Sequence, residues 1–142
     1  TAYEIMPSLV GSEMCIRDSD KGWKNRLELP RDIAPVQLAV LPLVSKDGLP
    51  QKAKQLHSLL IDEGFTVEYD ESGSIGRRYA RFDEIGTPLC ITVDYQSLED
   101  ETVTIRDRTT WKQVRAELKN LPDSLHRYFQ HKLDFEDLGV PV

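Results

Sequence analysis

Three arginines in the middle of the chain are the residues whose chemistry stands out first. Arg77, Arg78 and Arg81 lie within the stretch GSIGRRYARFDEIGTP, residues 73–88. A guanidinium group offers N–H donors in a fixed plane and binds phosphate or carboxylate oxygens through paired hydrogen bonds. The same region is acidic, so two interpretations stand: contacts with an anionic ligand, or ion pairs with neighbouring carboxylates. Those carboxylates are Asp70, Glu71, Asp83 and Glu84.

The spacing of apolar residues places these arginines on a short helix. Ile75, Tyr79 and Phe82 recur at intervals of four and three residues, which forms one buried helix face. Helix-starting and helix-ending signals flank this run: Ser72 or Ser74 before it, and Gly86 and Pro88 after it. The arginines are therefore expected to face outward from a helix that is fixed at both ends.

Further elements follow from the hydrophobic pattern of the remaining chain. Strands are predicted at residues 36–44, 65–69, 89–94 and 102–107, with a hairpin partner at 111–114. Two more helices are predicted at residues 50–62 and 124–133. We expect an acidic loop at 95–101 and a frayed tail at 134–142. This order predicts an α/β fold, with a mixed sheet of about five strands flanked by three helices.

Composition limits the classes of function. The chain has 142 residues, a net charge of −6 and a pI of about 5.1, which argues against indiscriminate nucleic-acid binding. No apolar run approaches the roughly 18 residues that a membrane span needs. The two cysteines, Cys15 and Cys90, form neither a disulfide framework nor a zinc motif. Cys90 falls in a predicted buried strand, where it is expected to act as a small apolar residue.

The first part of the chain has a different character. Residues 1–19, TAYEIMPSLVGSEMCIRDS, correspond in one reading frame to translated adapter DNA of a common sequencing-library chemistry. We therefore expect them to be non-native and joined to a truncated gene. Residues 20–34 are polar and without period, as expected for a linker that leads into a domain at residues 35–133.

Three segments together resemble a known family. They are AVLPLVSKDGLPQKAKQL, VEYDESGSIGRRYARFDEIGTPLCITVD and TVTIRDR. They are similar to the C-terminal anticodon-binding domain of the dimeric type of glycyl-tRNA synthetase, a class II aminoacyl-tRNA synthetase. The resemblance extends from about residue 30 to Arg115. The sequence departs from the family pattern after Arg115, which leaves residues 116–142 without an assigned role.

The resemblance implies an activity for the parent protein. Such an enzyme is cytoplasmic, activates glycine with ATP and Mg²⁺, and transfers it to tRNA-Gly. Its catalytic core is expected upstream, together with the homodimer interface, and none of the class II signature motifs occurs in residues 20–142. The fragment itself is expected to be catalytically inactive and to need no cofactor. Its expected partner is the anticodon stem-loop of tRNA-Gly.

The resemblance also implies positions for RNA contacts. These positions are Glu71 and Ser72 before the second helix, Gly86 and Thr87 after it, and Arg106 at the end of the fourth strand, with the turn from Asp94 to Gln96 on the same edge. Arg106 is the strongest expectation, as a donor to a base edge or phosphate; a salt bridge to Asp107 or Glu101 is the alternative. For Arg77, Arg78 and Arg81, phosphate contacts and ion pairing both stay open. Arg108 and Lys112 would extend the basic edge, or else are simply solvated.

Two further expectations concern base recognition. Glycine anticodons share cytosines at their last two positions, and a carboxylate can accept a hydrogen bond from the cytosine amino group. The residues considered for this role are Glu71, Asp94 and Glu84. Trp111, in the predicted hairpin, could stack on a base or pack in the core.

Two other functions compete with tRNA binding. A non-catalytic accessory protein could reuse the same fold, although the glycyl-type segments argue against it. A small-molecule-binding α/β domain is the other alternative, but no glycine-rich phosphate fingerprint follows a strand.

Overall fold

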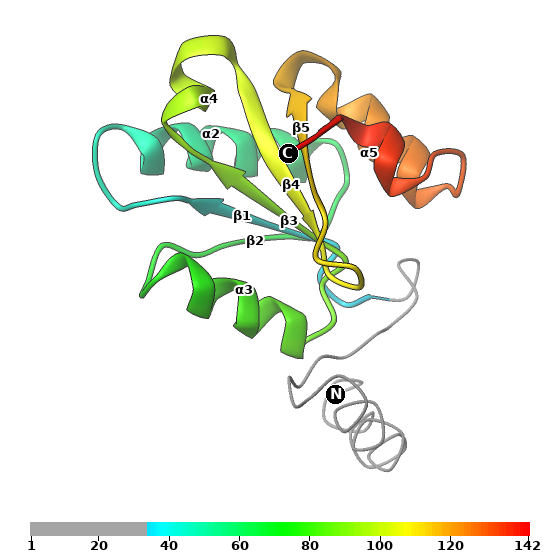
Figure 1. The fold of residues 1–142 in the computed structure, drawn as a ribbon, viewed down its shortest axis with the longest axis horizontal. Helices are drawn as coiled ribbons and strands as arrows, with labels where there is room; N and C mark the ends of the chain where they lie inside the picture. Colours follow the sequence, from blue (N-terminus) through cyan, green and yellow to red (C-terminus); the bar gives the residue numbers. More distant parts are fainter. Residues whose placement is uncertain (1–33) are drawn as a thin grey trace.

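A computed structural model describes residues 34–142 of the chain (Figure 1). The predictions for residues 1–19, and for all but the last residue of the 20–34 linker, lie outside the described residues. The described part forms a mixed sheet in the order β2-β1-β3-β4-β5-β6. The strands are β1 Leu38–Pro42, β2 Val67–Tyr69, β3 Leu89–Val93, β4 Thr102–Asp107, β5 Gln113–Glu117 and β6 Val140–Pro141. The α/β prediction is confirmed, with six strands rather than about five.

Strand directions divide the sheet into two parts. β1 pairs in parallel with both β2 and β3, whereas β3, β4, β5 and β6 pair antiparallel in succession. The helices are α2 Leu49–Asp62, α3 Ile75–Glu84, α4 Tyr95–Asp100 and α5 Leu121–Phe129, with short 3₁₀ turns η1 Leu118–Asn120 and η2 Phe135–Leu138. Across residues 34–142, none of these helices is long and apolar enough to cross a membrane.

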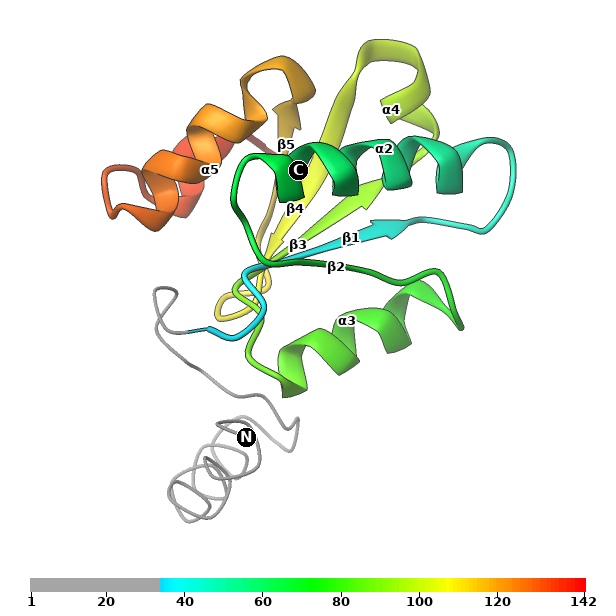
Figure 2. The same cartoon turned by 180° about the vertical axis from the view of Figure 1, so that it is seen from behind.

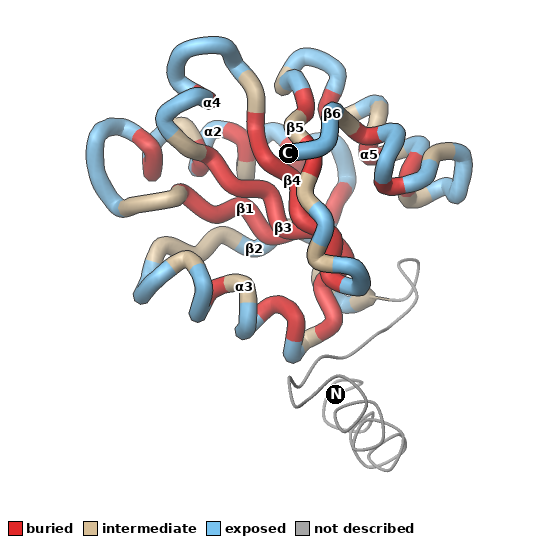
Figure 3. Tube along the Cα trace, viewed as in Figure 1, coloured by how far each residue is buried: buried red, intermediate tan, exposed pale blue. Residues whose placement is uncertain are grey.

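The helices cover the two faces of the sheet unequally. Figures 1 and 2 show α2 and α3 on opposite faces, with α5 on the side of α2. The larger hydrophobic cluster lies on the α2 side and includes Val103, Ile105 and Leu125, whereas the smaller one lies beneath α3 and contains Phe82 and Cys90. Strands β1 and β3 are buried along their whole length, as Figure 3 shows, which explains their nearly continuous apolar sequence.

Helix α3 begins and ends at the predicted signals. The Ser74 side chain accepts a hydrogen bond from the Arg77 backbone N–H at 3.3 Å. At the other end, Gly86 has a φ of +78°, a conformation that glycine adopts without steric cost. The Thr87 N–H donates to the Phe82 carbonyl at 3.0 Å, which closes the last turn. These two caps fix the length and the position of the arginine-bearing helix.

The predicted acidic loop at residues 95–101 is wrong, because a short helix, α4, occupies it. Asp94 accepts from the Ser97 backbone N–H at 3.1 Å, and the Ser97 hydroxyl accepts from the Asp94 N–H at 3.1 Å. This reciprocal capping box starts the helix. A six-residue helix offers too few apolar positions for a 3.6-residue period to appear in its sequence.

The predicted frayed tail at residues 134–142 is also wrong. Phe135 and Leu138 are buried in the larger cluster, and β6 pairs with β5. Gly139 lies so close to this strand that a Cβ atom there would be 2.2 Å from the Arg115 carbonyl oxygen. The last helix also lies earlier than predicted, with Pro122 inside its first turn. The C-terminal segment is therefore an integral part of the sheet and core.

Candidate nucleic-acid interface

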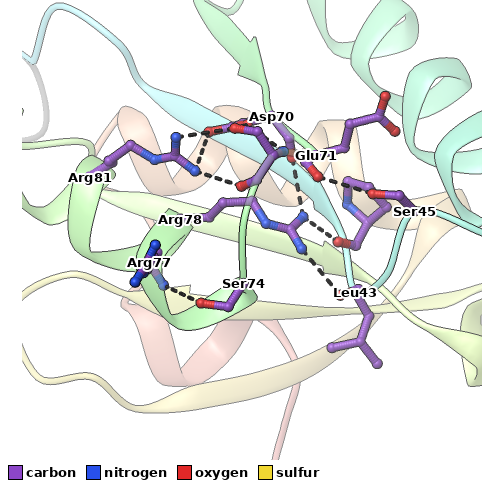
Figure 4. Close-up of polar contacts among 10 residues, drawn as sticks. Leu43, Ser45, Asp70, Glu71, Ser74, Arg77, Arg78 and Arg81 are labelled. Atoms are coloured by element: carbon purple, nitrogen blue, oxygen red, sulfur yellow. Dashed lines mark hydrogen bonds and ion pairs between the residues drawn. The ribbon is translucent and has the colours of Figure 1, made fainter.

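The three arginines of α3 occupy three different environments (Figure 4). Arg77 is exposed, and its guanidinium forms no ion pair with the other described residues. The Arg81 side chain is 48% exposed and pairs with Asp70 at 3.0 Å. Arg78 is only 2% exposed. The expectation that all three face outward is therefore correct for Arg77 and Arg81 and wrong for Arg78.

Arg78 joins α3 to the ends of two strands. Its Nη1 donates to the carbonyls of Pro42 and Asp70, the latter at 3.3 Å, and its Nη2 donates to the Leu43 carbonyl at 3.2 Å. These carbonyls lie where β1 and β2 end. The sequence carries a signal for this role, since Arg78 lies three residues after Ile75 and four before Phe82, on the apolar stripe of the helix. Arg78 does not form the ion pair that the sequence left open, because the acceptors of its guanidinium are backbone carbonyl oxygens.

Arg81 belongs to a local polar turn before α3. Asp70 accepts from the Ser72 N–H at 2.9 Å and from its hydroxyl at 2.8 Å, while Arg81 donates to the Ser72 carbonyl at 2.7 Å. Burial alone would raise the pKa of Asp70, but the two hydrogen bonds from Ser72 and the charge of Arg81 hold it below its ordinary value. Ser72, predicted as an RNA contact, is thus exposed and also supports the turn.

Glu71 lies in the same turn and is partly buried. Its carboxylate accepts from the Tyr69 hydroxyl at 2.9 Å, and its carbonyl accepts from Ser45 at 3.0 Å. Burial, followed by the hydrogen bond to Glu71, raises the pKa of Tyr69 to about 12. One oxygen of the Glu71 carboxylate is therefore engaged within the domain.

Arg106 is buried in an ion pair with a residue of α3. It is 9% exposed, and its Nη1 and Nη2 lie 3.2 and 3.4 Å from the two carboxylate oxygens of Asp83. Its guanidinium carbon stands 4.5 Å from the centre of the Tyr79 ring and 5.7 Å from that of Trp111. The sequence-based alternative of an ion pair is correct in kind, but its proposed partners were wrong.

Those two expected partners are used elsewhere. Asp107 accepts from the Thr110 N–H at 2.9 Å and its hydroxyl at 2.7 Å, which closes the β4–β5 turn. Glu101 pairs with Lys52 of α2 at 2.6 Å. Asp83 precedes Arg106 by 23 residues, and only the packing of α3 on this face of the sheet brings the two together.

The segment after α3, which contains Gly86 and Thr87, is buried against the end of β4, where Arg108 contacts it. The Arg108 Nη1 donates to the Gly86 carbonyl at 2.6 Å, and its backbone N–H donates to the Pro88 carbonyl at 3.0 Å. Thr87 is fully buried. Lys112 is exposed on the same hairpin and lies 3.7 Å from Glu136. Of the basic residues predicted on this edge, Lys112 is thus solvated, whereas Arg108 holds the α3–β3 loop against β4.

Asp94 and Gln96 lie at the other end of the sheet from Arg106, which corrects the expectation of a shared edge. Cys90 is the register partner of Arg106, and Asp94 follows it by four residues, about 13 Å along the strand. Arg115 donates to both oxygens of Asp94, at 2.7 and 2.8 Å. Gln96 is exposed and donates to Asp100 at 2.9 Å. The strand register places Glu71 and Ser72 at this end as well.

A row of polar side chains connects the two ends. On β4 and β5, every second residue points away from the larger core, on the face that carries α3. Arg115 Nε donates to Thr102 at 2.8 Å and Nη1 to Thr104 at 3.0 Å, which orders these groups. We call this set of residues the polar sheet face; Thr102, Gln113 and Arg115 are partly exposed, whereas Thr104 and Arg106 are buried. It was not predicted as a unit, although the alternation in TVTIRD was its signal.

The Asp94–Arg115 pair predicts a dependence of stability on pH. Hydrogen bonds from Arg115 are the main reason that the pKa of Asp94 lies below its ordinary value. The folded chain therefore binds fewer protons than the unfolded one, and the stabilisation present at neutral pH is lost as pH falls through about 4 and below. We expect Asp94→Asn to lower the free energy of unfolding at pH 7 by about 1 kcal/mol. Urea titrations from pH 7 to 3 should show the difference between wild type and variant shrinking; a constant difference would contradict the assignment.

Comparison with known families identifies the class of protein. Residues 37–128 match the family model described as an anticodon binding domain, so the chain belongs to this family. Within it, the chain is similar to archaeal glycine–tRNA ligases, with which it shares their C-terminal region. It is 56% identical over 117 residues to the glycine–tRNA ligase of Aeropyrum pernix, and 50% identical over 113 residues to that of Archaeoglobus fulgidus. The resemblance found in the sequence is therefore confirmed.

The extent of these matches matters for function. They cover 82% and 80% of this chain but only 20% of each relative, so the chain spans about a fifth of their length. Among solved structures, a prolyl-tRNA synthetase from Cryptosporidium parvum aligns with a TM-score of 0.68 at 20% identity, over 75% of this chain and 23% of that one. At this identity the match shows a shared fold.

Proposed function

We propose that this chain is the tRNA-binding part of a glycine–tRNA ligase and that it holds the anticodon stem-loop of tRNA-Gly. The observation that carries the proposal is the 56% identity to a glycine–tRNA ligase over 82% of the chain. Identity at this level favours a ligase domain over the accessory-protein alternative. In the parent enzyme, which we place in the cytoplasm, ATP and Mg²⁺ would serve glycine activation in the remaining four-fifths of the protein.

The polar sheet face supports this proposal geometrically. Unpaired RNA bases are commonly recognised on the exposed face of a β-sheet, where two or three bases can lie side by side. The distance of about 13 Å between the two ends of this face suits that number of bases. Thr102, Gln113 and Arg115, its partly exposed members, offer groups that can hydrogen-bond to base edges.

Phosphate binding is proposed for the exposed side of α3. Arg77 and Arg81 line an open hollow of about 310 Å³ together with Gly73 and Ala80. Arg77 stands in solvent, and its guanidinium can approach a phosphate without breaking an ion pair with another described residue. Arg81 would first have to share its contact with Asp70. Arg77 is therefore the main phosphate contact that we propose. The buried Arg78 is not among the proposed contacts.

Cytosine recognition by a carboxylate also remains a proposal, narrowed by the contacts described above. Asp94 is bound through both oxygens to Arg115, and Glu71 holds the Tyr69 hydroxyl. Glu84 is exposed at the end of α3. We therefore propose Glu84 for this role, and a Glu84→Gln variant that keeps the full preference for cytosine-containing loops would exclude it.

The experiment that tests the proposed function is a titration of the 142-residue chain with the tRNA-Gly anticodon stem-loop, followed by fluorescence anisotropy at low and moderate salt. The control RNA carries replacements of both shared cytosines. We expect tighter binding of the native loop. Arg77→Ala should weaken both complexes similarly and reduce the slope of log K against log salt by about 1.

The matched protein control is Arg127→Ala. Arg127 is also an exposed arginine, but it lies on α5, on the opposite face of the sheet. It should leave affinity and salt slope unchanged. Equal losses in the two variants would indicate non-specific attraction, and an absence of binding at both salt concentrations would contradict the proposed function for this chain.

A further inference from the structure

The turn between β4 and β5 holds a tryptophan in an unusual backbone conformation. Trp111 has a φ of +61°, in the left-handed region that bulky residues rarely adopt. Its backbone N–H donates to the Asp107 carbonyl at 2.9 Å, and the Asp107 carboxylate accepts two hydrogen bonds from Thr110. These hydrogen bonds hold the backbone of the turn that carries Trp111.

The rings of Trp111 and Tyr79 both lie near the Arg106 guanidinium. Tyr79 lies 4.5 Å from the Arg106 guanidinium, and Trp111 lies 5.7 Å from the same group. Asp83 contacts both terminal nitrogens of that guanidinium. Arg106 is 9% exposed, whereas Trp111 is partly exposed. At this end of the polar sheet face the tryptophan is therefore more accessible than the arginine, although its indole Nε1 is buried.

A core role does not explain this placement. The two hydrophobic clusters of the described residues contain the inward-facing side chains of β4 and β5, and Trp111 belongs to neither cluster. From the sequence alone, base stacking and core packing both stayed open. The position of Trp111 outside both clusters, at the end of a row of hydrogen-bonding groups, favours base stacking.

We propose that Trp111 is a stacking platform for one unpaired base of the bound RNA loop, and so a further binding residue of the interface. Bases stack on aromatic side chains in single-stranded RNA recognition, and a stacked base brings its polar edge beside neighbouring donors. Here Arg106 and Gln113, which are register partners on β4 and β5, carry donors on the adjoining strands. The inference rests on the proposed function, because it assumes that an RNA loop occupies the polar sheet face.

The backbone of the same nucleotide has a partner on the hairpin. Lys112 follows Trp111, is exposed, and faces Glu136 at a distance of 3.7 Å. Exposed ion pairs of this kind contribute little stability, so exchanging Glu136 for a phosphate costs little. A stacked base on Trp111 and its phosphate near Lys112 would then be held by adjacent residues.

The test uses the intrinsic fluorescence of the chain. The sequence contains two tryptophans, Trp23 and Trp111, so Trp23→Phe leaves Trp111 as the only one. Titrating this variant with the tRNA-Gly anticodon stem-loop should quench and shift the emission of Trp111, with a midpoint equal to that obtained from anisotropy. A fully paired RNA duplex with the sequence of the stem, which has no unpaired bases, should leave the emission unchanged. Binding seen by anisotropy without any change in emission would overturn the stacking proposal and leave the proposed function standing.

Affinity measurements give a second readout. Trp111→Leu should weaken loop binding about tenfold, whereas Trp111→Phe, which keeps an aromatic ring, should stay within about threefold of wild type. The slope of affinity against salt should not change, because stacking releases no counterions. Replacing the stacked base by an abasic sugar should lower the affinity of the wild-type chain about tenfold. The same RNA should bind Trp111→Leu almost as well as the intact loop does.

The outcomes separate the two proposals. If Trp111→Leu abolishes the affinity loss caused by an abasic sugar at no single position of the loop, the stacking proposal fails even though the loop binds. If Trp111→Leu lowers thermal stability strongly and Trp111→Phe binds as weakly as Trp111→Leu, Trp111 acts through the hairpin and the stacking proposal also fails. If neither loop RNA binds the wild-type chain, the proposed function fails and the stacking proposal fails with it.

Discussion

Replacing Arg78 by methionine is expected to lower the free energy of unfolding by about 3 kcal/mol, a large share of the stability of a small domain. The guanidinium donates to three backbone carbonyls from a side chain that is 2% exposed. Methionine fills a similar volume but donates no hydrogen bond, so the carbonyls of Pro42, Leu43 and Asp70 lose this partner. Lysine should recover only part of the loss, because a single ammonium group cannot match the spread of the guanidinium donors.

Urea unfolding at pH 7, followed by circular dichroism, measures this effect. The matched control is Arg77→Met, which makes the same change one residue earlier, on the exposed side of α3. Its effect should stay within about 0.5 kcal/mol, as is usual for surface substitutions. A loss for Arg78→Met as small as that expected for Arg77→Met would show that the contacts of Arg78 are dispensable. A selective loss would establish that Arg78 stabilises the fold and that Arg77 does not.

The elements that the sequence predicts correctly are those with a period and a stop signal. Strand β1, within the apolar run at residues 36–44, ends at Pro42, and α2 ends just before Gly64, whose φ is +97°. Helix α3 has its cap at Ser74 and its stop at Gly86. In each of these cases the physical cause lies within a few neighbouring residues, so the sequence contains it.

The elements that the sequence misses depend on distant partners or on very short motifs. Phe135 is buried because the tail folds back over β5, and the residues 134–142 carry no period that announces this contact. Helix α4 depends on the reciprocal bonds between Asp94 and Ser97. An aspartate followed three residues later by serine is too common a pattern to predict a helix by itself.

The candidate site shows the same division between local and distant causes. The sequence indicates that Arg106 contacts either RNA or a carboxylate of the chain. The choice of Asp83 as that carboxylate follows from the packing of α3 on the sheet. The separation of Asp94 from Arg106 likewise follows from the antiparallel register of β3 and β4. Arg78 is the exception, because its place on the apolar stripe could have identified it as a buried residue.

The ion pair between Asp83 and Arg106 is the second site at which a large effect is expected. Both side chains are about nine-tenths buried, and their terminal atoms meet at 3.2 and 3.4 Å. Asp83→Asn removes the negative charge and leaves the arginine charge with little access to water. We expect the free energy of unfolding to fall by about 2 kcal/mol, less than for a complete deletion, because the amide oxygen still accepts one hydrogen bond. Asp62→Asn, the same change at an exposed position on α2, should cost less than about 0.5 kcal/mol.

The same variant distinguishes two roles for Arg106 in RNA binding. If Arg106 donates to the RNA, it must exchange Asp83 for the new acceptor, and weakening the ion pair lowers the cost of that exchange. Asp83→Asn should then bind both the native and the cytosine-replaced stem-loops more tightly at low salt, with a smaller preference and a salt slope steeper by about 1. The Asp62→Asn control changes the net charge equally and should show none of this. Weaker binding of Asp83→Asn with an unchanged preference would mean that Arg106 acts by holding Trp111 and the hairpin in place rather than by touching the RNA.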